Sequence, residues 1–273
     1  MEKLDLEGLK KVQLEILDVV NEFCKEHQIN YWLDCGTLIG AIRHKGYIPW
    51  DDDIDIGMLR DDYDKFMKLF NEENKRYQFY SIENNKDFLV QFGKVLDTKT
   101  ILYEPNKEQG IKLNINIDVF VYDNAPDDEM LCQKMFKKRD MYLKLRYAQL
   151  YPNFYDKTSW KKKIMRFFLK IYLNFLPKNY YTKKIIKNSR KYINDDTKRV
   201  GNFTSVSKFV GDKELFKEFV KVEFEGKKYP APLGYDTWLR NIYGDYMKLP
   251  PVEKRVSHHE FEAYKLEDRE NGE

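Results

Sequence analysis

Apolar residues in the first half of the chain recur first with helical and then with strand spacing. Over residues 6–24 they return every three or four positions, which predicts an amphipathic helix with one buried face. Over 53–56 and 113–122, apolar and polar residues alternate one by one, which is typical of strands with one buried face. Between these segments, 31–33 reads as a short strand and 38–43 as a short helix.

The rest of the pattern predicts a mixed α/β core and a separate helical segment. Further strands are expected at 77–81 and 89–96, with a helix at 61–70 between the two alternating strands. The later segments are helices at 127–150, 160–176 and 180–193, a hairpin at 220–224 and 228–230, and a helix at 235–243. We therefore predict an α/β (mixed α+β) fold in three parts: a core over 1–126, a helical subdomain over 127–199, and a segment over 200–273 that completes the core.

Composition narrows the class of protein. The 273 residues are 42% hydrophobic, which is enough for a large core, and no run approaches eighteen uncharged apolar residues. The start of the chain has no signal-peptide pattern, so we expect a cytoplasmic protein that is at most peripheral at the inner face of the membrane. Three scattered cysteines without a Cys-x-x-Cys spacing predict reduced thiols rather than a disulfide framework or a zinc site.

The charge is distributed unevenly along the chain. Residues 134–199 hold 20 Lys and Arg against four Asp, while the remainder is acidic. Within this segment, 160–187 interleaves basic with bulky apolar residues, a pattern that suits peripheral contact with an anionic membrane or a polyanionic glycan. Ordinary helical packing with a charged outer face is the alternative. No recognised nucleic-acid-binding module accompanies the charge, so no nucleic acid partner is expected.

The most informative feature is a cluster of four aspartates within five positions, 51–55. On a strand, Asp53 and Asp55 point to the same face about 6.5–7 Å apart, so their carboxylates can converge on one hard cation, with Asp51 joining them. A solvated acidic loop is the alternative, but it leaves the buried partners Ile54 and Ile56 unexplained. A calcium loop of the EF-hand type is excluded, because the required glycine and glutamate are missing.

Two further features fit phosphoryl chemistry. A Gly36-Thr37 turn at a helix start offers backbone N–H groups to a phosphate. Asp118, between Ile117 and Val119, is the natural third acid, and a metal-bridged carboxylate there could accept the proton of an attacking hydroxyl. The alternative for Asp118 is a polar residue on an exposed strand face.

Three stretches of sequence together resemble a known family. They are YWLDCGTLIGAIRHKGYIPWDDDIDIGM, INIDVF and YGDYMKLPPVEKRVSHH. They resemble the LicD family of phosphocholine transferases, which is related to the fukutin-type ribitol-phosphate transferases and built on the nucleotidyltransferase fold. The resemblance implies a nucleotidyltransferase-like core sheet with flanking helices. It also implies transfer of a phospho-alcohol, typically phosphocholine from CDP-choline, to a sugar hydroxyl of a cell-surface glycan or its lipid-linked precursor, such as teichoic acid or lipopolysaccharide.

The resemblance also implies roles for individual residues. Asp53 and Asp55 match the metal-binding pair for Mg²⁺ or Mn²⁺, Asp51 the preceding acid, and Asp118 the third acid, with Asp118, Asp53 and Asp55 as the catalytic set. Gly36 and Thr37 match the turn that holds the nucleotide phosphates.

Other residues near these motifs are weaker predictions. Arg43, Lys94, Arg255 and His258 are expected to contact the phosphates or the glycan, although Arg43 could equally be a solvated arginine at a helix end. Trp50 and Tyr243 are candidates for an aromatic pocket for a quaternary ammonium, since ring faces attract such a cation, but a place in the core or at its rim is the favoured alternative for each.

Two rival functions remain open at the level of sequence. The first is a nucleotidyltransferase that transfers a nucleotide from a nucleoside triphosphate to a small molecule or protein. The second is a non-catalytic, basic surface-binding protein in which the acidic cluster is inert and Asp53 is dispensable.

Overall fold

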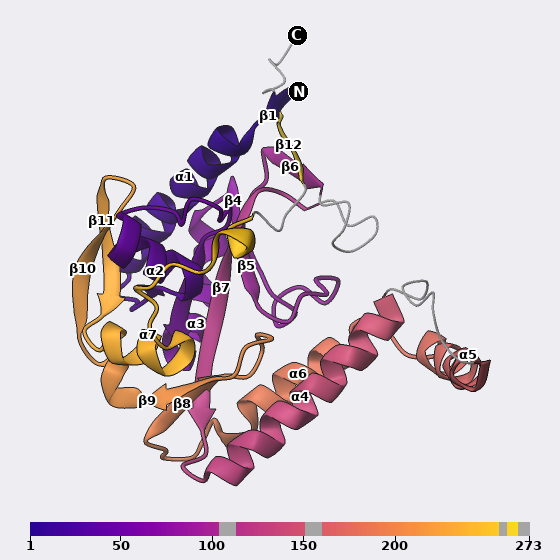
Figure 1. Cartoon of the computed structure of the whole chain (residues 1–273). Helices are drawn as coiled ribbons and strands as arrows, with labels where there is room; N and C mark the ends of the chain where they lie inside the picture. The colour runs from indigo at the N-terminus through magenta and orange to yellow at the C-terminus, as the bar shows by residue number, and fades with distance from the viewer. Residues whose placement is uncertain (104–112, 151–159, 257–260, 267–273) are drawn as a thin grey trace.

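A mixed sheet forms the centre of the molecule (Figure 1). The computed structural model describes residues 1–103, 113–150, 160–256 and 261–266. The strands of this sheet follow the order β2-β3-β7-β5-β4, with β8 paired to β7 and β9 paired to β8. They are β2 (Trp32–Leu33), β3 (Asp55–Leu59), β4 (Tyr77–Tyr80), β5 (Gly93–Asp97), β7 (Asn116–Ala125), β8 (Arg199–Asn202) and β9 (Phe209–Asp212). Strands β3 and β7 run parallel, whereas the other pairs are antiparallel.

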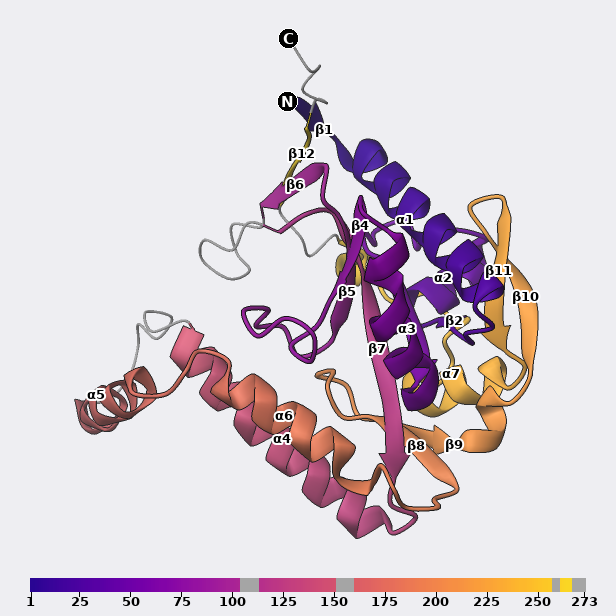
Figure 2. The same cartoon turned by 180° about the vertical axis from the view of Figure 1, so that it is seen from behind.

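Two amphipathic helices, α1 (Leu6–Glu26) and α3 (Arg60–Glu73), lie against one face of this sheet (Figure 2). The Asp5 side chain caps α1 by accepting a hydrogen bond from the Gly8 N–H at 2.8 Å. From α1, Val12, Ile16, Leu17 and Val20 are buried in the core. Each fully buried side chain of this kind contributes about 1.5–3 kcal/mol to folding, so the helix is anchored mainly by its apolar stripe.

Shorter elements complete the core around the sheet. They are α2 (Cys35–His44), the hairpin β10 (Phe219–Phe224) and β11 (Lys227–Pro232), the 3₁₀ turns at Lys213–Phe216 and Val252–Lys254, and α7 (Tyr235–Tyr243). A small second sheet joins the two ends of the described chain, in the order β1-β12-β6. Its strands are β1 (Glu2–Leu4), β6 (Thr100–Tyr103) and β12 (Glu262–Lys265).

The basic segment forms long helices beside this core. Helices α4 (Glu129–Leu150) and α6 (Tyr180–Ser189) lie side by side, and α5 (Trp160–Asn174) stands at the far end of α4 (Figures 1 and 2). A 3₁₀ turn at Arg190–Tyr192 follows α6. Among the described helices, none combines the length and the apolarity that crossing a membrane would need.

The predicted α/β class is confirmed, and so is the helix at 235–243. The strand predicted at 53–56 is wrong at its start, because β3 begins only at Asp55: Asp51 closes a turn that starts at Ile48, and Asp52 and Asp53 follow it without regular structure. The strand predicted at 89–96 is instead Gly93–Asp97. Neither β8, which pairs with the end of β7, nor β9, which pairs with β8, was among the predicted strands. The division into three parts stays a prediction.

Candidate active site

The parallel pairing of β3 and β7 places two of the predicted acids beside each other. Asp55 and Asp118 are register partners, and the Asp118 N–H donates to the Ile54 carbonyl at 2.8 Å. On the other side of β7, Lys94 of β5 is the register partner of Asp118. Side chains of directly paired residues share a sheet face, so Asp55, Asp118 and Lys94 form a row across three strands.

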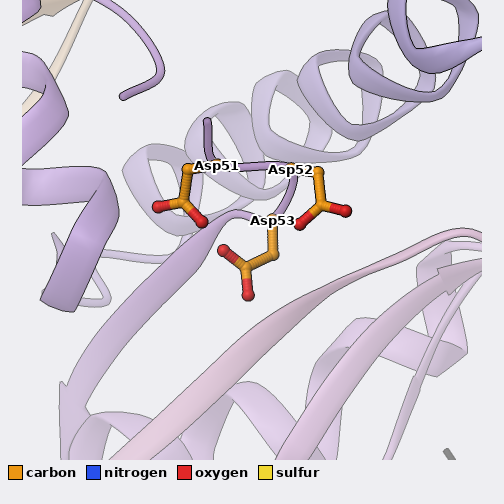
Figure 3. Close-up of side chains that lie close together, drawn as sticks. All are labelled: Asp51, Asp52 and Asp53. Carbon is orange, nitrogen blue, oxygen red and sulfur yellow. The ribbon is translucent and has the colours of Figure 1, made fainter. Parts of the chain in front are cut away.

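Asp51, Asp52 and Asp53 lie immediately before this row (Figure 3). One carboxylate oxygen from each lies within 4.8 Å of the others. The buried Gln13 of α1 donates to the Asp52 carbonyl at 3.0 Å and to the Asn116 carbonyl at 3.4 Å, which ties the turn to the start of β7. The helix α1 therefore positions the acidic turn as well as covering the sheet.

The charge around Asp55 is strongly negative. Burial raises the pKa of Asp55 well above its usual value, and the carboxylates of Asp53, Asp118, Asp34 and Asp51 raise it further. Of the four predicted ligands, Asp51 and Asp53 belong to the close group of carboxylates, together with Asp52. Asp55 and Asp118 are outside that group, but both are near enough to share its negative potential, and they are register partners. Their carboxylate oxygens are the ligands that hard divalent cations prefer, so this set of donors fits Mg²⁺.

The Gly36-Thr37 turn lies against the acidic cluster at the start of α2. The Thr37 hydroxyl accepts a hydrogen bond from the Asp55 N–H at 2.8 Å, so this side chain fixes the beginning of β3. A Cβ on Gly36 would come within 2.7 Å of the Asp51 Oδ2 atom. The missing side chain therefore lets the Asp51 carboxylate approach the positive N-terminus of α2, where an anion is favoured.

Lys94 contacts an acid in this structure. Its ammonium forms an ion pair with Asp118 and a hydrogen bond of 2.8 Å to the Asn116 side-chain oxygen. Both members of the ion pair are largely buried. This ion pair orients the Asp118 carboxylate within the row.

Two arginines from distant segments meet beside the acidic turn. The pKa of Arg43 is lowered, first by burial and then by the positive charge of Arg255. Arg43 donates to the Tyr246 carbonyl at 2.6 Å, while the Arg255 guanidinium lies 5.7 Å from the ring centroid of Trp50. Two neighbouring cations repel each other unless an anion lies between them, so this pair suits a phosphate. His258 lies outside the described residues.

Comparison with known proteins identifies relatives of this chain. Residues 28–154 match the model of the family described as LicD/FKTN/FKRP, nucleotidyltransferase domain. The lipopolysaccharide cholinephosphotransferase LicD of Haemophilus influenzae is 35% identical over 97% of this chain and 100% of its own length. This chain belongs to the LicD family. It is accordingly a transferase, and the resemblance found in its sequence motifs is confirmed.

Shorter matches reach other members of the family. The ribitol 5-phosphate transferase FKRP of human is 50% identical over 34 residues, which are 12% of this chain and 7% of that protein. An uncharacterized protein of Rickettsia typhi, RT0683, is 29% identical over 42% of this chain and 33% of its own length.

Sequence reasoning overlooked several residues that shape this LicD-family site. Asp52 was not among the predicted site residues, yet its carboxylate lies with those of Asp51 and Asp53. Asp34 is fully buried and accepts a hydrogen bond of 2.6 Å from the Tyr122 hydroxyl. Burial raises the pKa of Asp34, and burial together with the charge of Asp34 raises the pKa of the neighbouring Cys35 thiol. The sequence signal for Asp34 was an acid two residues before the Gly-Thr turn, at the position of a helix N-cap.

Proposed function

We propose that this chain transfers phosphocholine from CDP-choline to a sugar hydroxyl of a cell-surface glycan of the lipopolysaccharide or teichoic acid type, and that the reaction requires Mg²⁺ or Mn²⁺. The observation that supports the proposal is the negative charge of Asp51, Asp53 and Asp118 acting on the buried Asp55 in a LicD-family chain. The named activity of the Haemophilus influenzae relative supplies the transferred group and one acceptor class.

The reaction assigns a task to each acid. Asp51, Asp53 and Asp55 hold the metal ion, which when bound neutralises the charge of the diphosphate. The acceptor oxygen forms a bond to the phosphorus that carries choline, and the bond from that phosphorus to the bridging oxygen breaks, so that CMP leaves. Asp118 is the less buried acid of the β3–β7 register pair, and it accepts the hydroxyl proton.

The cationic groups bind the donor. Arg43 and Arg255 clamp the diphosphate from the side of α2, which offsets their mutual repulsion. Lys94 keeps the Asp118 carboxylate in register with Asp55 through its ion pair. The Gly36-Thr37 turn supports the part of the site that binds the diphosphate, because Gly36 contacts Asp51 and Thr37 holds the start of β3.

Tyr243 is the better of the two aromatic candidates for the choline group. Its ring is 42% exposed, whereas one face of Trp50 already carries the Arg255 guanidinium. Burial and the charges of Cys35, Asp34 and Asp55 raise the pKa of the Tyr243 hydroxyl, so the side chain is neutral at physiological pH. A quaternary ammonium seated on this ring would also face the negative potential around Asp55.

Product analysis tests the proposal directly. The purified chain, CDP-choline, Mg²⁺ and a lipopolysaccharide acceptor should yield CMP together with an acceptor whose mass has increased by one phosphocholine group. Asp53→Asn, Asp55→Asn and Asp118→Asn should each lower turnover at least 100-fold while the circular dichroism spectrum is unchanged. Asp61→Asn, which removes an exposed acid of α3, is the matched control and should turn over like the wild type.

Two results would contradict the proposal. Activity within tenfold of the wild type in all three site variants, at saturating Mg²⁺, would rule out the metal site. Release of pyrophosphate from a nucleoside triphosphate, without CMP from CDP-choline, would support the rival nucleotidyltransferase function.

A further inference from the structure

The helix α5 carries large apolar side chains that no other part of the described protein covers. Phe167, Phe168, Ile171, Tyr172 and Phe175 are all exposed, with 64% of Phe168 and 84% of Phe175 accessible to solvent. Exposed apolar residues of this size are scattered singly on an ordinary surface. Five of them within nine positions mark a contact surface.

These residues lie on one side of the helix. At about 100° per residue, positions 167, 168, 171 and 172 fall within an arc of roughly 140°, and Phe175 directly follows the last residue of the helix, Asn174. Leu173 is buried on the opposite side, where the Gln149 amide of α4 donates to its carbonyl at 3.2 Å. The helix is therefore attached to α4 by one side and presents the aromatic arc on the other.

The basic residues around this surface indicate which partner it contacts. The segment 134–199 holds 20 Lys and Arg against four Asp, and Lys170 of α5 is exposed next to the aromatic arc. On the neighbouring α4, Lys134, Lys137, Lys138 and Lys144 are exposed as well. A second copy of the chain would bring two strongly basic segments together, which is unfavourable, whereas an anionic lipid surface complements both the charge and the apolar side chains.

We infer that α5 is a membrane-docking helix, whose aromatic arc enters the headgroup region of an anionic bilayer while the surrounding lysines contact the lipid charges. The position of α5 at the far end of α4, away from the acidic site, leaves the active site accessible during docking (Figures 1 and 2). This inference does not depend on the identity of the transferred group, because it rests on exposure and charge alone.

Vesicle sedimentation of the full chain tests the inference. Vesicles of phosphatidylcholine with 30% phosphatidylglycerol should bind the wild type at 0.1 M NaCl. Vesicles of phosphatidylcholine alone should bind it at least tenfold more weakly, because each lysine near an anionic surface contributes about a fivefold factor. Raising the salt to 0.5 M should release most of the protein, since the Debye length is about 10 Å at 0.1 M and shortens with salt.

Substitutions distinguish the contribution of the aromatic arc to vesicle binding from the contribution of the lysines. The variant Phe167→Ser/Phe168→Ser/Phe175→Ser keeps every lysine and should bind the anionic vesicles at least tenfold more weakly, with an unchanged melting temperature and unchanged activity on a soluble acceptor. The control Met130→Ser/Val206→Ser removes two exposed apolar side chains outside α5 and should bind like the wild type.

The opposite results would overturn the inference. Wild-type vesicle binding by the triple variant would show that the arc is not inserted. Equal, negligible binding of the wild type to both kinds of vesicle would remove the membrane as the partner. A dimer in analytical ultracentrifugation that the triple variant abolishes, combined with that absence of vesicle binding, would identify α5 as a contact between copies.

Discussion

Asp55 is destabilising for the protein without a metal, and in the proposed reaction its carboxylate would bind one. Its carboxyl is buried near four other carboxylates, so its ionised form is unfavourable in the native state. A bound divalent cation would relieve this unfavourable electrostatic free energy. The proposed metal site therefore predicts that the stability of the protein and its metal affinity are coupled through this residue.

Replacement of Asp55 by Asn should raise the stability of the metal-free protein at pH 7. The native pKa of Asp55 lies above the unfolded value of about 3.9, so the native state binds the extra proton in the window between the two values. The free energy of unfolding of the wild type should fall as the pH rises through that window. In Asp55→Asn this part of the decrease should be absent.

Urea unfolding in EDTA, measured from pH 4 to 8, checks this prediction. Added Mg²⁺ should reverse the order at pH 7, because only the wild type gains the full binding energy of the ion. A variant less stable than the wild type at every pH in EDTA would show that the Asp55 carboxylate is stabilised by its surroundings instead.

Gly36 is predicted to affect activity through its close contact with the Asp51 carboxylate. In Gly36→Ala the new methyl group would displace the Asp51 carboxylate, which is the flexible end of a side chain, so stability should change by less than about 1 kcal/mol. Activity at limiting Mg²⁺ should fall at least tenfold, because Asp51 moves away from the N-terminus of α2.

A double-mutant cycle checks whether Gly36 acts through Asp51. Once Asp51→Ala is present, adding Gly36→Ala should have little further effect on the Mg²⁺ dependence. Independent, additive losses would show that Gly36 acts directly on the substrate.

At the scale of elements, a buried ion-pair network joins the helical segment to the core. Arg60 at the start of α3 binds both oxygens of Asp123 in β7, at 2.6 and 3.0 Å, and also contacts Glu83. Ser189 at the end of α6 donates to Asp123, and Arg190 binds Glu83 at 2.5 Å. Three elements that are distant in sequence therefore share one set of charges.

Asp123→Asn should destabilise the protein by about 3 kcal/mol or more, because it leaves the buried Arg60 without its bidentate partner. The midpoint of urea unfolding reports this change. Glu214→Gln, which breaks an exposed pair with Lys217, is the control and should cost no more than about 1 kcal/mol. Equal effects of the two substitutions would show that the Arg60 network contributes nothing beyond a surface pair.

The elements also show what sequence patterns can and cannot predict. Helices with a clear apolar stripe, such as α1 and α7, were predicted within two residues of their ends, because the stripe follows from local spacing. The start of β3 was placed two residues too early, because the preceding segment is shaped by the Asp51 N–H bond to the Ile48 carbonyl and by Gln13 of α1 on the Asp52 carbonyl. The β8–β9 pairing depends on long-range contact with β7, which no local pattern contains.

The same distinction holds for the candidate site. The acids on β3 and β7 could be assigned from alternation and motif, and the structure brings Asp55 and Asp118 together. The ion pair of Lys94 with Asp118 could not be read from the sequence, because it follows from the order of strands in the sheet. The hydrogen bond from Tyr122 to Asp34 could likewise not be predicted, since it joins residues 88 positions apart.

At the scale of the whole molecule, the site combines residues from both ends of the chain. Asp53 and Asp118 come from the first half, while Tyr243 of α7 and Arg255 come from the last forty residues and reach the site near α2. The basic helices between them project away from this site (Figure 1). The acidic core is thus suited to the metal-bound donor, and the basic helices to a different, anionic partner.

If the donor binds across this composite site, it should stabilise the entire chain. A ligand at about 100 times its dissociation constant adds roughly 2.7 kcal/mol to the free energy of unfolding, which raises the melting temperature of a chain of this size by several degrees. CDP-choline with Mg²⁺ should produce such a shift in the wild type and in Asp61→Asn, and a much smaller one in Asp53→Asn. CDP-choline in EDTA should have little effect, because the carboxylates then repel the diphosphate. Strong stabilisation by ATP, GTP or UTP, with none by CDP-choline or CDP-ribitol, would assign the site to nucleoside triphosphates, since the same acids and arginines would then be binding a triphosphate.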